Sequence, residues 1–152
     1  MDENTTLLSV DGVGAFDLIS RKAMREGLLD MPNGDNFLPF VRLFYGSPST
    51  FLWEDEMGTV NFVPQGEGGE QGDPLMPLLF CLGQHRGLCA VAERLGPREH
   101  LVAFLDDVYV ATNSPATTVD AHNILGEEMW RHASLHFGKT VIWQKRPCTR
   151  RC

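Results

Sequence analysis

Short apolar runs alternate along the chain with longer stretches in which apolar residues recur every three to four positions. Residues 7–10 form an apolar run that ends at Asp11, and residues 101–105 and 108–112 form two more, with a pair of acidic residues between them. Runs of this length bounded by turn residues predict β-strands, and the longer periodic stretches predict amphipathic helices.

Further strands are expected at residues 50–53, 59–63 and 140–143, and helices at residues 21–29, 37–45, 73–95 and 118–136. Ser20 is the expected cap of the first helix and Asp73 that of the third, with Pro74 at its first position. Thr118 or Asp120 is expected to cap the last helix. The helix after Pro74 is apolar over most of its surface, which predicts a central position.

The order of these elements is strand, helices, hairpin, helix, hairpin, helix, strand. Strands mixed with packed helices in this way favour an α+β fold, with a largely antiparallel sheet and helices on one face. The 152 residues contain no repeat and no low-complexity linker, which indicates one domain with a substantial core.

Composition limits the classes of function. Hydrophobic residues make up 43% and charged residues 22%, as in soluble globular proteins, and the net charge is −7. This charge argues against broad, unspecific phosphate binding by the segment alone. No apolar run approaches the roughly 18 residues of a membrane span, and the acidic start is unlike a secretory signal. An intracellular protein, nuclear or cytoplasmic and not secreted, is expected.

The cysteines allow one alternative chemistry. Cys81 and Cys89 lie in the apolar helical stretch and are expected to be small core residues. A second group consists of His132, His136, Cys148 and Cys152, which could hold zinc. Its spacing fits no common zinc module, so a solvated helix face followed by a basic tail is the favoured interpretation.

Three carboxylates carry the clearest chemical signal. Asp106 and Asp107 stand between two apolar strands, and Asp11 ends another. If those strands are neighbours, the acids converge at one edge and offer oxygen ligands for two divalent ions roughly 3.5–4 Å apart. The alternative is a hairpin with solvated acids and an unrelated aspartate at a strand end. Spacing alone leaves both interpretations open.

A glycine-dense loop at residues 65–72 precedes the long helix. Glycine backbone can approach a phosphate or a base closely because no Cβ intervenes. Glu67 and Glu70 within the loop would repel a phosphate, so contact with a base or sugar is the favoured interpretation.

Together these elements resemble the palm of reverse transcriptases, most closely those of non-LTR retrotransposons and group II introns. The segments that carry the resemblance are Val10-Asp11-Gly12-Val13-Gly14-Ala15-Phe16-Asp17, Gln71-Gly72-Asp73-Pro74-Leu75-Met76-Pro77, Phe104-Leu105-Asp106-Asp107 and Gly138-Lys139-Thr140. They occur in the order of that family. The resemblance implies a polymerase palm, formed by residues 1–152 as a single partial domain with a motif-bearing core at about 7–143.

The resemblance implies a metal site and the catalytic acids. Asp11 and Asp106 would be the main ligands of two Mg²⁺ ions, with Mn²⁺ as an alternative, and Asp107 would lie beside them in a more indirect role. The Gly12 carbonyl would complete the shell of one ion. Asp17 is interpreted as a helix cap and not as a catalyst.

It also implies substrate contacts, at Gly14, Ala15, Phe16, Gln71, Gly72 and Lys139. The backbone of the first two would meet the phosphates, and Phe16 would pack under the sugar and exclude a 2′-hydroxyl. Phe16 as an ordinary core aromatic is the alternative. Gln71 and Gly72 would position the nascent base pair. Lys139 would approach the triphosphate or only anchor a strand.

The implied function is that of an RNA-directed DNA polymerase palm of a retroelement, with an RNA or DNA template, a primer and deoxynucleotides as partners. The fingers and thumb segments of a full-length polyprotein would lie outside residues 7–143. Glu70, Met76 and Leu105 depart from the residues that the family often has there. Two alternatives stay open: a catalytically inactive remnant or scaffold that binds RNA or protein, and another palm-type nucleotidyl enzyme such as a cyclase.

Overall fold

The computed structural model describes residues 5–70 and 72–144. The elements are β1 (Thr6–Gly12), α1 (Ala15–Leu18), α2 (Arg21–Asp30), a 3₁₀ turn (Gly34–Asn36), α3 (Leu38–Tyr45), β2 (Ser49–Glu54), β3 (Val60–Gln65), α4 (Met76–Arg94), β4 (His100–Phe104), β5 (Asp107–Thr112), α5 (Pro115–Ala133) and β6 (Phe137–Gln144). The order predicted from the sequence is confirmed.

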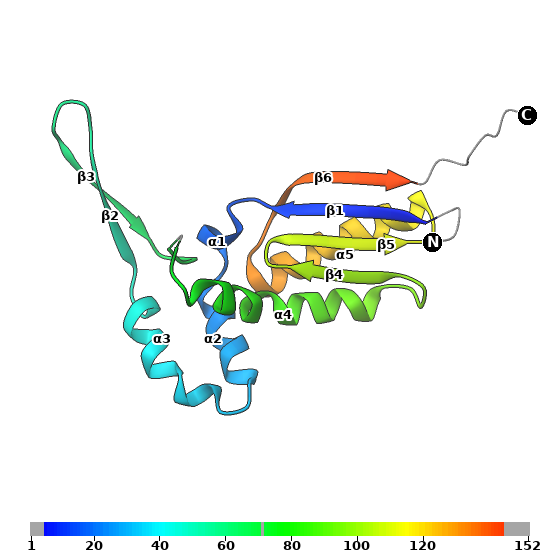
Figure 1. Cartoon of the computed structure of the whole chain (residues 1–152), viewed down its shortest axis with the longest axis horizontal. Helices are drawn as coiled ribbons and strands as arrows, with labels where there is room; N and C mark the ends of the chain where they lie inside the picture. The colour runs from blue at the N-terminus through cyan, green and yellow to red at the C-terminus, as the bar shows by residue number, and fades with distance from the viewer. Residues whose placement is uncertain (1–4, 71, 145–152) are drawn as a thin grey trace, which may run out of the picture.

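A four-stranded antiparallel sheet in the order β4-β5-β1-β6 forms the body of the fold, and α4 and α5 pack on one of its faces (Figure 1). Side chains alternate across each strand. Leu8 and Val10 of β1, and Val108 and Val110 of β5, are buried toward the helices. The residues between them face the other side, which no helix of residues 5–70 and 72–144 covers. The predicted α+β architecture is therefore confirmed.

The helix α4 occupies the centre of the helical layer, where it packs against both α2 and α5. Its buried strip includes Phe80 and two glycines, Gly83 and Gly87. The glycines let neighbouring elements approach closely. The expectation that Cys81 and Cys89 are core residues is wrong, because both lie on the solvent side of this helix. No helix within the described residues is long and apolar enough to cross a membrane.

The strands β2 and β3 form a separate two-stranded ribbon that projects away from the main sheet (Figure 1). The ribbon has apolar side chains exposed on both strands, namely Phe51, Leu52, Trp53, Val60, Phe62 and Val63. Two strands alone cannot bury a face, so these side chains remain in solvent.

Two helix starts differ from the prediction. The helix α4 begins at Met76 and not at Asp73, because the Asp73 carboxylate accepts the Leu75 amide at 2.8 Å in a turn ahead of the helix. The helix α5 is capped by Ser114 in a capping box with Thr117. Thr118 is instead fully buried, and its hydroxyl contacts that of Thr112 at 2.6 Å.

Candidate active site

The two acidic motifs meet at one edge of the sheet. β1 pairs with β5 so that Asp11 stands directly opposite Asp107, and both side chains are exposed on the face without helices. Directly paired positions have Cβ atoms roughly 4.5–5.5 Å apart. Asp106 occupies the loop between β4 and β5, where Phe104 pairs with Asp107. The strand arrangement that would make the acids converge is therefore present in the structure.

Lys139 extends this arrangement to the far edge of the sheet. β6 pairs with β1 so that Lys139 stands opposite Asp11, just before a bulge between Asp11 and Gly12. Asp107, Asp11 and Lys139 thus form a cross-strand row of exposed charged residues on one face. No ion pair joins Lys139 to Asp11 among the described residues, so the ammonium group is available to another anion.

The row supplies the donors that a hard cation prefers, yet it is not a closed ligand cage. Oxygen ligands from exposed carboxylates on two adjacent strands suit Mg²⁺ or Mn²⁺. Within residues 5–70 and 72–144, however, no group of three or more His, Cys, Asp and Glu side chains lies close enough together to hold a metal ion. Two paired carboxylates supply part of the ligand shell of a divalent cation, and a bound ion would need further oxygen donors from backbone, solvent or substrate.

The loop that follows β1 leads from the acids into the first short helix. Gly14 adopts a left-handed conformation with φ 53° and precedes α1, while Ala15 is buried in the core. The Gly14 backbone carbonyl accepts hydrogen bonds from the amides of Asp17 and Leu18, at 2.9 Å each. The main chain of Gly12 and Gly14 is therefore placed at the exposed edge near Asp11, without bulky side chains of its own.

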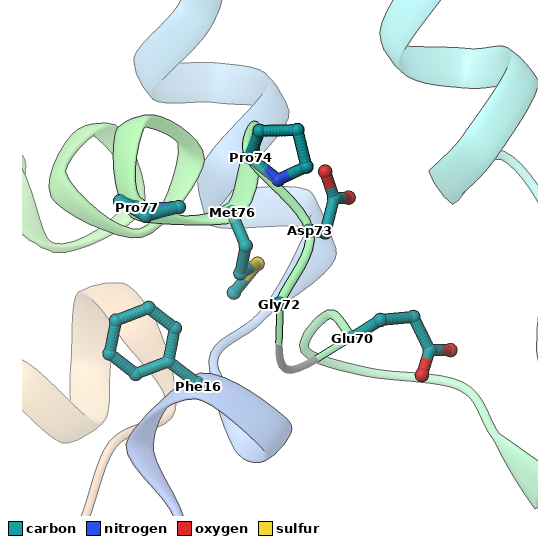
Figure 2. A pocket seen from close by; sticks show the side chains of 7 residues that line it. All are labelled: Phe16, Glu70, Gly72, Asp73, Pro74, Met76 and Pro77. Carbon is teal, nitrogen blue, oxygen red and sulfur yellow. The ribbon is translucent and has the colours of Figure 1, made fainter.

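Phe16 lines a hollow of about 460 Å³ (Figure 2). Its ring stacks on Phe80 with centroids 4.5 Å apart and 9° between the planes, so the core-aromatic interpretation is correct for one face. The other lining residues belong to the glycine loop and the start of α4: Glu70, Gly72, Asp73, Pro74, Met76 and Pro77. The Glu70 side chain points away from Phe16 in Figure 2. Gln71, predicted to contact the base pair, lies outside the described residues.

The glycine loop is fastened to the first motif by backbone hydrogen bonds. The Gly68 amide donates to the Ile19 carbonyl at 2.8 Å, and the Gly69 amide donates to the Phe16 carbonyl at 2.9 Å. Gly68 has φ 62°, and a Cβ there would come within 2.2 Å of the Asp17 backbone. Glycine is needed at this position because the two loops touch main chain to main chain.

Arg21 also binds the glycine loop, through both its side chain and its backbone amide. Its guanidinium donates to the carbonyls of Gly68 at 2.8 Å and Ser47 at 2.7 Å, and it lies over the Tyr45 ring at 5.4 Å. The Arg21 backbone amide donates to the Glu67 carboxylate at 2.6 Å. Glu67 therefore binds the first backbone amide of α2, next to the predicted Ser20 cap, which is confirmed.

Tyr45 joins α3 to the start of α4. Its hydroxyl donates to the Asp73 carboxylate, whose other oxygen accepts the Leu75 amide. Burial raises the pKa of the Tyr45 phenol, and the neighbouring Asp73 carboxylate raises it further. Asp73 is thus a structural residue at the edge of the hollow, although it stabilises the turn ahead of α4 and is not the predicted cap of that helix.

Replacing Tyr45 with Phe should destabilise the protein by about 1–2 kcal/mol, since a hydrogen bond to a carboxylate is lost. Because the phenol pKa is raised in the folded state, this contribution is complete below about pH 10 and fades as the pH rises further. Urea unfolding at pH 7 measures the effect. Tyr109→Phe is the matched control, since Tyr109 makes no side-chain hydrogen bond within the described residues and should change stability by less than about 0.5 kcal/mol. Equal losses in the two variants would contradict the assignment.

Nothing in the sequence predicts the roles of Arg21, Tyr45 and Gln84. Arg21 reads as the first residue of a helix and Tyr45 as an apolar helical position, and their contacts join segments 26 to 47 residues apart. Gln84 stands among other polar residues of the same helix, His85 and Arg86, so only the structure distinguishes it as buried. Of the zinc alternative, Cys148 and Cys152 lie outside the described residues, while His136 stacks on Trp130 and His132 lies 3.5 Å from Glu128.

Comparison with known proteins supports the resemblance to reverse transcriptases. No family model matches the chain. The chain is 30% identical over 107 residues to the retrovirus-related Pol polyprotein from the type-2 retrotransposable element R2DM of Drosophila melanogaster. This match covers 67% of the chain and 10% of the polyprotein, so the chain spans about a tenth of the relative's length.

The fold is similar to part of the telomerase chain. Apo telomerase from Candida tropicalis superimposes with a TM-score of 0.71 at 13% identity, over 95% of this chain and 28% of that one. Telomerase from Candida albicans, solved with a fragment of telomeric RNA, superimposes with a TM-score of 0.69 at 15% identity, over 96% of this chain and 28% of that one. The chain therefore has an α+β, palm-like fold, and its similarity to the R2 polyprotein fits a reverse-transcriptase-like domain.

Proposed function

We propose that this chain is the palm segment of a retroelement RNA-directed DNA polymerase, which adds deoxynucleotides to a primer 3′-hydroxyl. In that reaction the hydroxyl oxygen bonds to the α-phosphorus, the bond to the β-phosphate oxygen breaks, and pyrophosphate and a proton leave. The observation that carries the proposal is the pairing of Asp11 with Asp107 beside the Asp106 turn. The similarity to a retrotransposon Pol polyprotein supports it.

Asp11 and Asp106 are the proposed ligands of two Mg²⁺ ions, with Asp107 beside them and the Gly12 carbonyl as a further oxygen donor. Bound there, the ions would favour deprotonation of the attacking hydroxyl and neutralise charge on the leaving phosphate oxygens. The pairing of Asp11 with Asp107 brings two anionic side chains together on a solvent-exposed face, where a cation relieves their mutual repulsion.

The remaining residues bind and orient the substrate in this proposal. The Gly14 and Ala15 backbone contacts the phosphates, and Lys139, opposite Asp11, places a positive charge beside the same row. Phe16 supports the sugar from below. Gly72 lines the hollow next to Phe16. Gln71 and Gly72 together are the proposed contacts of the nascent base pair. An RNA or DNA template with a primer is the proposed partner.

The test is primer extension on an RNA template with Mg²⁺ and labelled deoxynucleotides. The full chain is assayed alone and in a chimera in which residues 5–144 replace the matching segment of the R2 Pol polyprotein. We expect extension by the chimera, because fingers and thumb are then supplied. A folded chimera that binds primer-template but does not extend it would favour the inactive remnant or scaffold.

Replacing Phe16 with Val should relax the choice of sugar. The smaller side chain opens the hollow beneath the sugar, so the preference for deoxynucleotides over ribonucleotides in the chimera should fall by about 10-fold or more. Incorporation of each nucleotide class at equal concentration measures this ratio.

Phe80→Leu is the control for Phe16→Val. It also breaks the stacked pair, but Phe80 is fully buried and does not line the hollow. The sugar preference should survive in this variant. If both variants lose the preference equally, Phe16 acts through packing and not through contact with the sugar.

A further inference from the structure

One side-chain hydrogen bond ties the turn that carries Asp106 to the central helix. Gln84 of α4 donates from Nε2 to the Leu105 carbonyl at 2.9 Å. Its side chain is 3% exposed, within a strip of α4 that is otherwise apolar or glycine. A buried amide costs free energy unless it is hydrogen-bonded, so this contact accounts for an otherwise unfavourable residue.

The turn needs such a restraint. Leu105 has φ 54°, the left-handed region that residues with a Cβ adopt at a cost in free energy. It fills the first position of the loop between Phe104 and Asp107. Because Leu105 and Asp106 share a peptide bond, a change of conformation at Leu105 redirects the carboxylate that follows it.

We infer that Gln84 is a positioning residue, whose amide fixes the Leu105 carbonyl and thereby aims Asp106 toward the edge that Asp11 and Asp107 share. This inference rests on the proposed function, because it takes that edge to be a divalent-cation site. Gln84 is buried behind the turn, so it acts on the cation only through Leu105 and Asp106.

The test uses the full chain and Gln84→Met, which keeps the length and apolar volume but removes the donor. In the metal-free protein, the backbone amides of residues 105–107 should exchange with solvent at least about fivefold faster, since one hydrogen bond is lost. Binding of Mn²⁺, followed by electron paramagnetic resonance, should weaken by about fivefold.

Thr112→Val is the matched control. Thr112 lies at the other end of β5, and its hydroxyl contacts Thr118 at 2.6 Å in a buried site. This variant also loses a buried hydrogen bond, but it should leave both the exchange of residues 105–107 and the Mn²⁺ affinity unchanged. A second variant, Gln84→Met with Leu105→Gly, should recover part of the affinity, because glycine adopts the left-handed conformation without strain.

Each result decides a different point. The inference alone is overturned if Gln84→Met leaves the exchange of residues 105–107 unchanged. It is also overturned if Gln84→Met leaves the Mn²⁺ affinity unchanged while Asp11→Asn abolishes the Mn²⁺ binding that the wild-type chain shows. Equal weakening in Thr112→Val also overturns it, since the effect is then one of general stability. A wild-type chain without any Mn²⁺ site that depends on Asp11 overturns the proposed function and, with it, the role of Gln84 in cation binding.

Discussion

Replacing Asp11 with Asn should lower primer extension by the R2 chimera about a thousandfold, the scale expected when a preorganised charged group is removed from an active site. The amide keeps the size of the side chain but not the negative charge that a divalent ion requires. Asp11 is exposed, so the folded structure should be unaffected. Single-turnover extension rates at saturating primer-template measure the loss, and Asp106→Asn should match it.

Asp17→Asn is the matched control for Asp11→Asn. Asp17 is also exposed, and lies six residues further along the chain in α1, away from the paired strands. Its replacement should change the rate less than about twofold, because it is not in the row of charged residues. If Asp11→Asn keeps more than a tenth of the wild-type rate while the protein is folded, the two-metal assignment fails.

Replacing Gly27 with Ala should destabilise the fold, in contrast to the other glycine-to-alanine replacement that we propose, Gly126→Ala. A Cβ at Gly27 would lie 2.1 Å from the Leu82 carbonyl oxygen, where α2 packs against α4. Two packed helices can relieve that overlap only by moving apart, at a cost of about 3 kcal/mol. Thermal unfolding followed by circular dichroism should show a midpoint lowered by about 6–12 °C.

Gly126→Ala tests the same substitution where there is room for it. Gly126 lies inside α5, and nothing is within 4 Å of a Cβ placed there. Alanine favours the helix over glycine by up to about 1 kcal/mol, so the midpoint should rise slightly. The two variants therefore have opposite expected signs. A similar midpoint in both would show that α2 and α4 are not packed as closely as the structure indicates.

The sequence predicted the elements well because their patterns are local. Residues 7–10 and 108–112 read as strands from a short run of apolar side chains, and both are strands. The predicted start of α4 is too early, because one Asp73 oxygen accepts the Leu75 amide and the other accepts the Tyr45 hydroxyl. The predicted caps of α5, Thr118 or Asp120, are wrong because Ser114 caps the helix, and Ser114-Pro115 is an N-terminal helix signal.

The candidate site could be predicted only as far as its residue types. The sequence indicated that Asp11 and the acidic pair would converge if their strands were neighbours, and the strand order meets that condition. It could not place Lys139 opposite Asp11, because that needs the register of β6. Nor could it show that Arg21 fastens the glycine loop, since that contact joins residues 47 positions apart.

The pairing of β1 with its two neighbours also determines which changes in chain length the site can tolerate. Successive side chains of a strand point to opposite faces, so losing one codon between Thr6 and Asp11 would turn Asp11 toward the helices if the remaining pairing were kept. Losing two codons would keep the face but move Asp11 by roughly 7 Å along the sheet, away from Asp107. For this edge, the length of β1 is therefore a stricter requirement than the identity of its apolar residues.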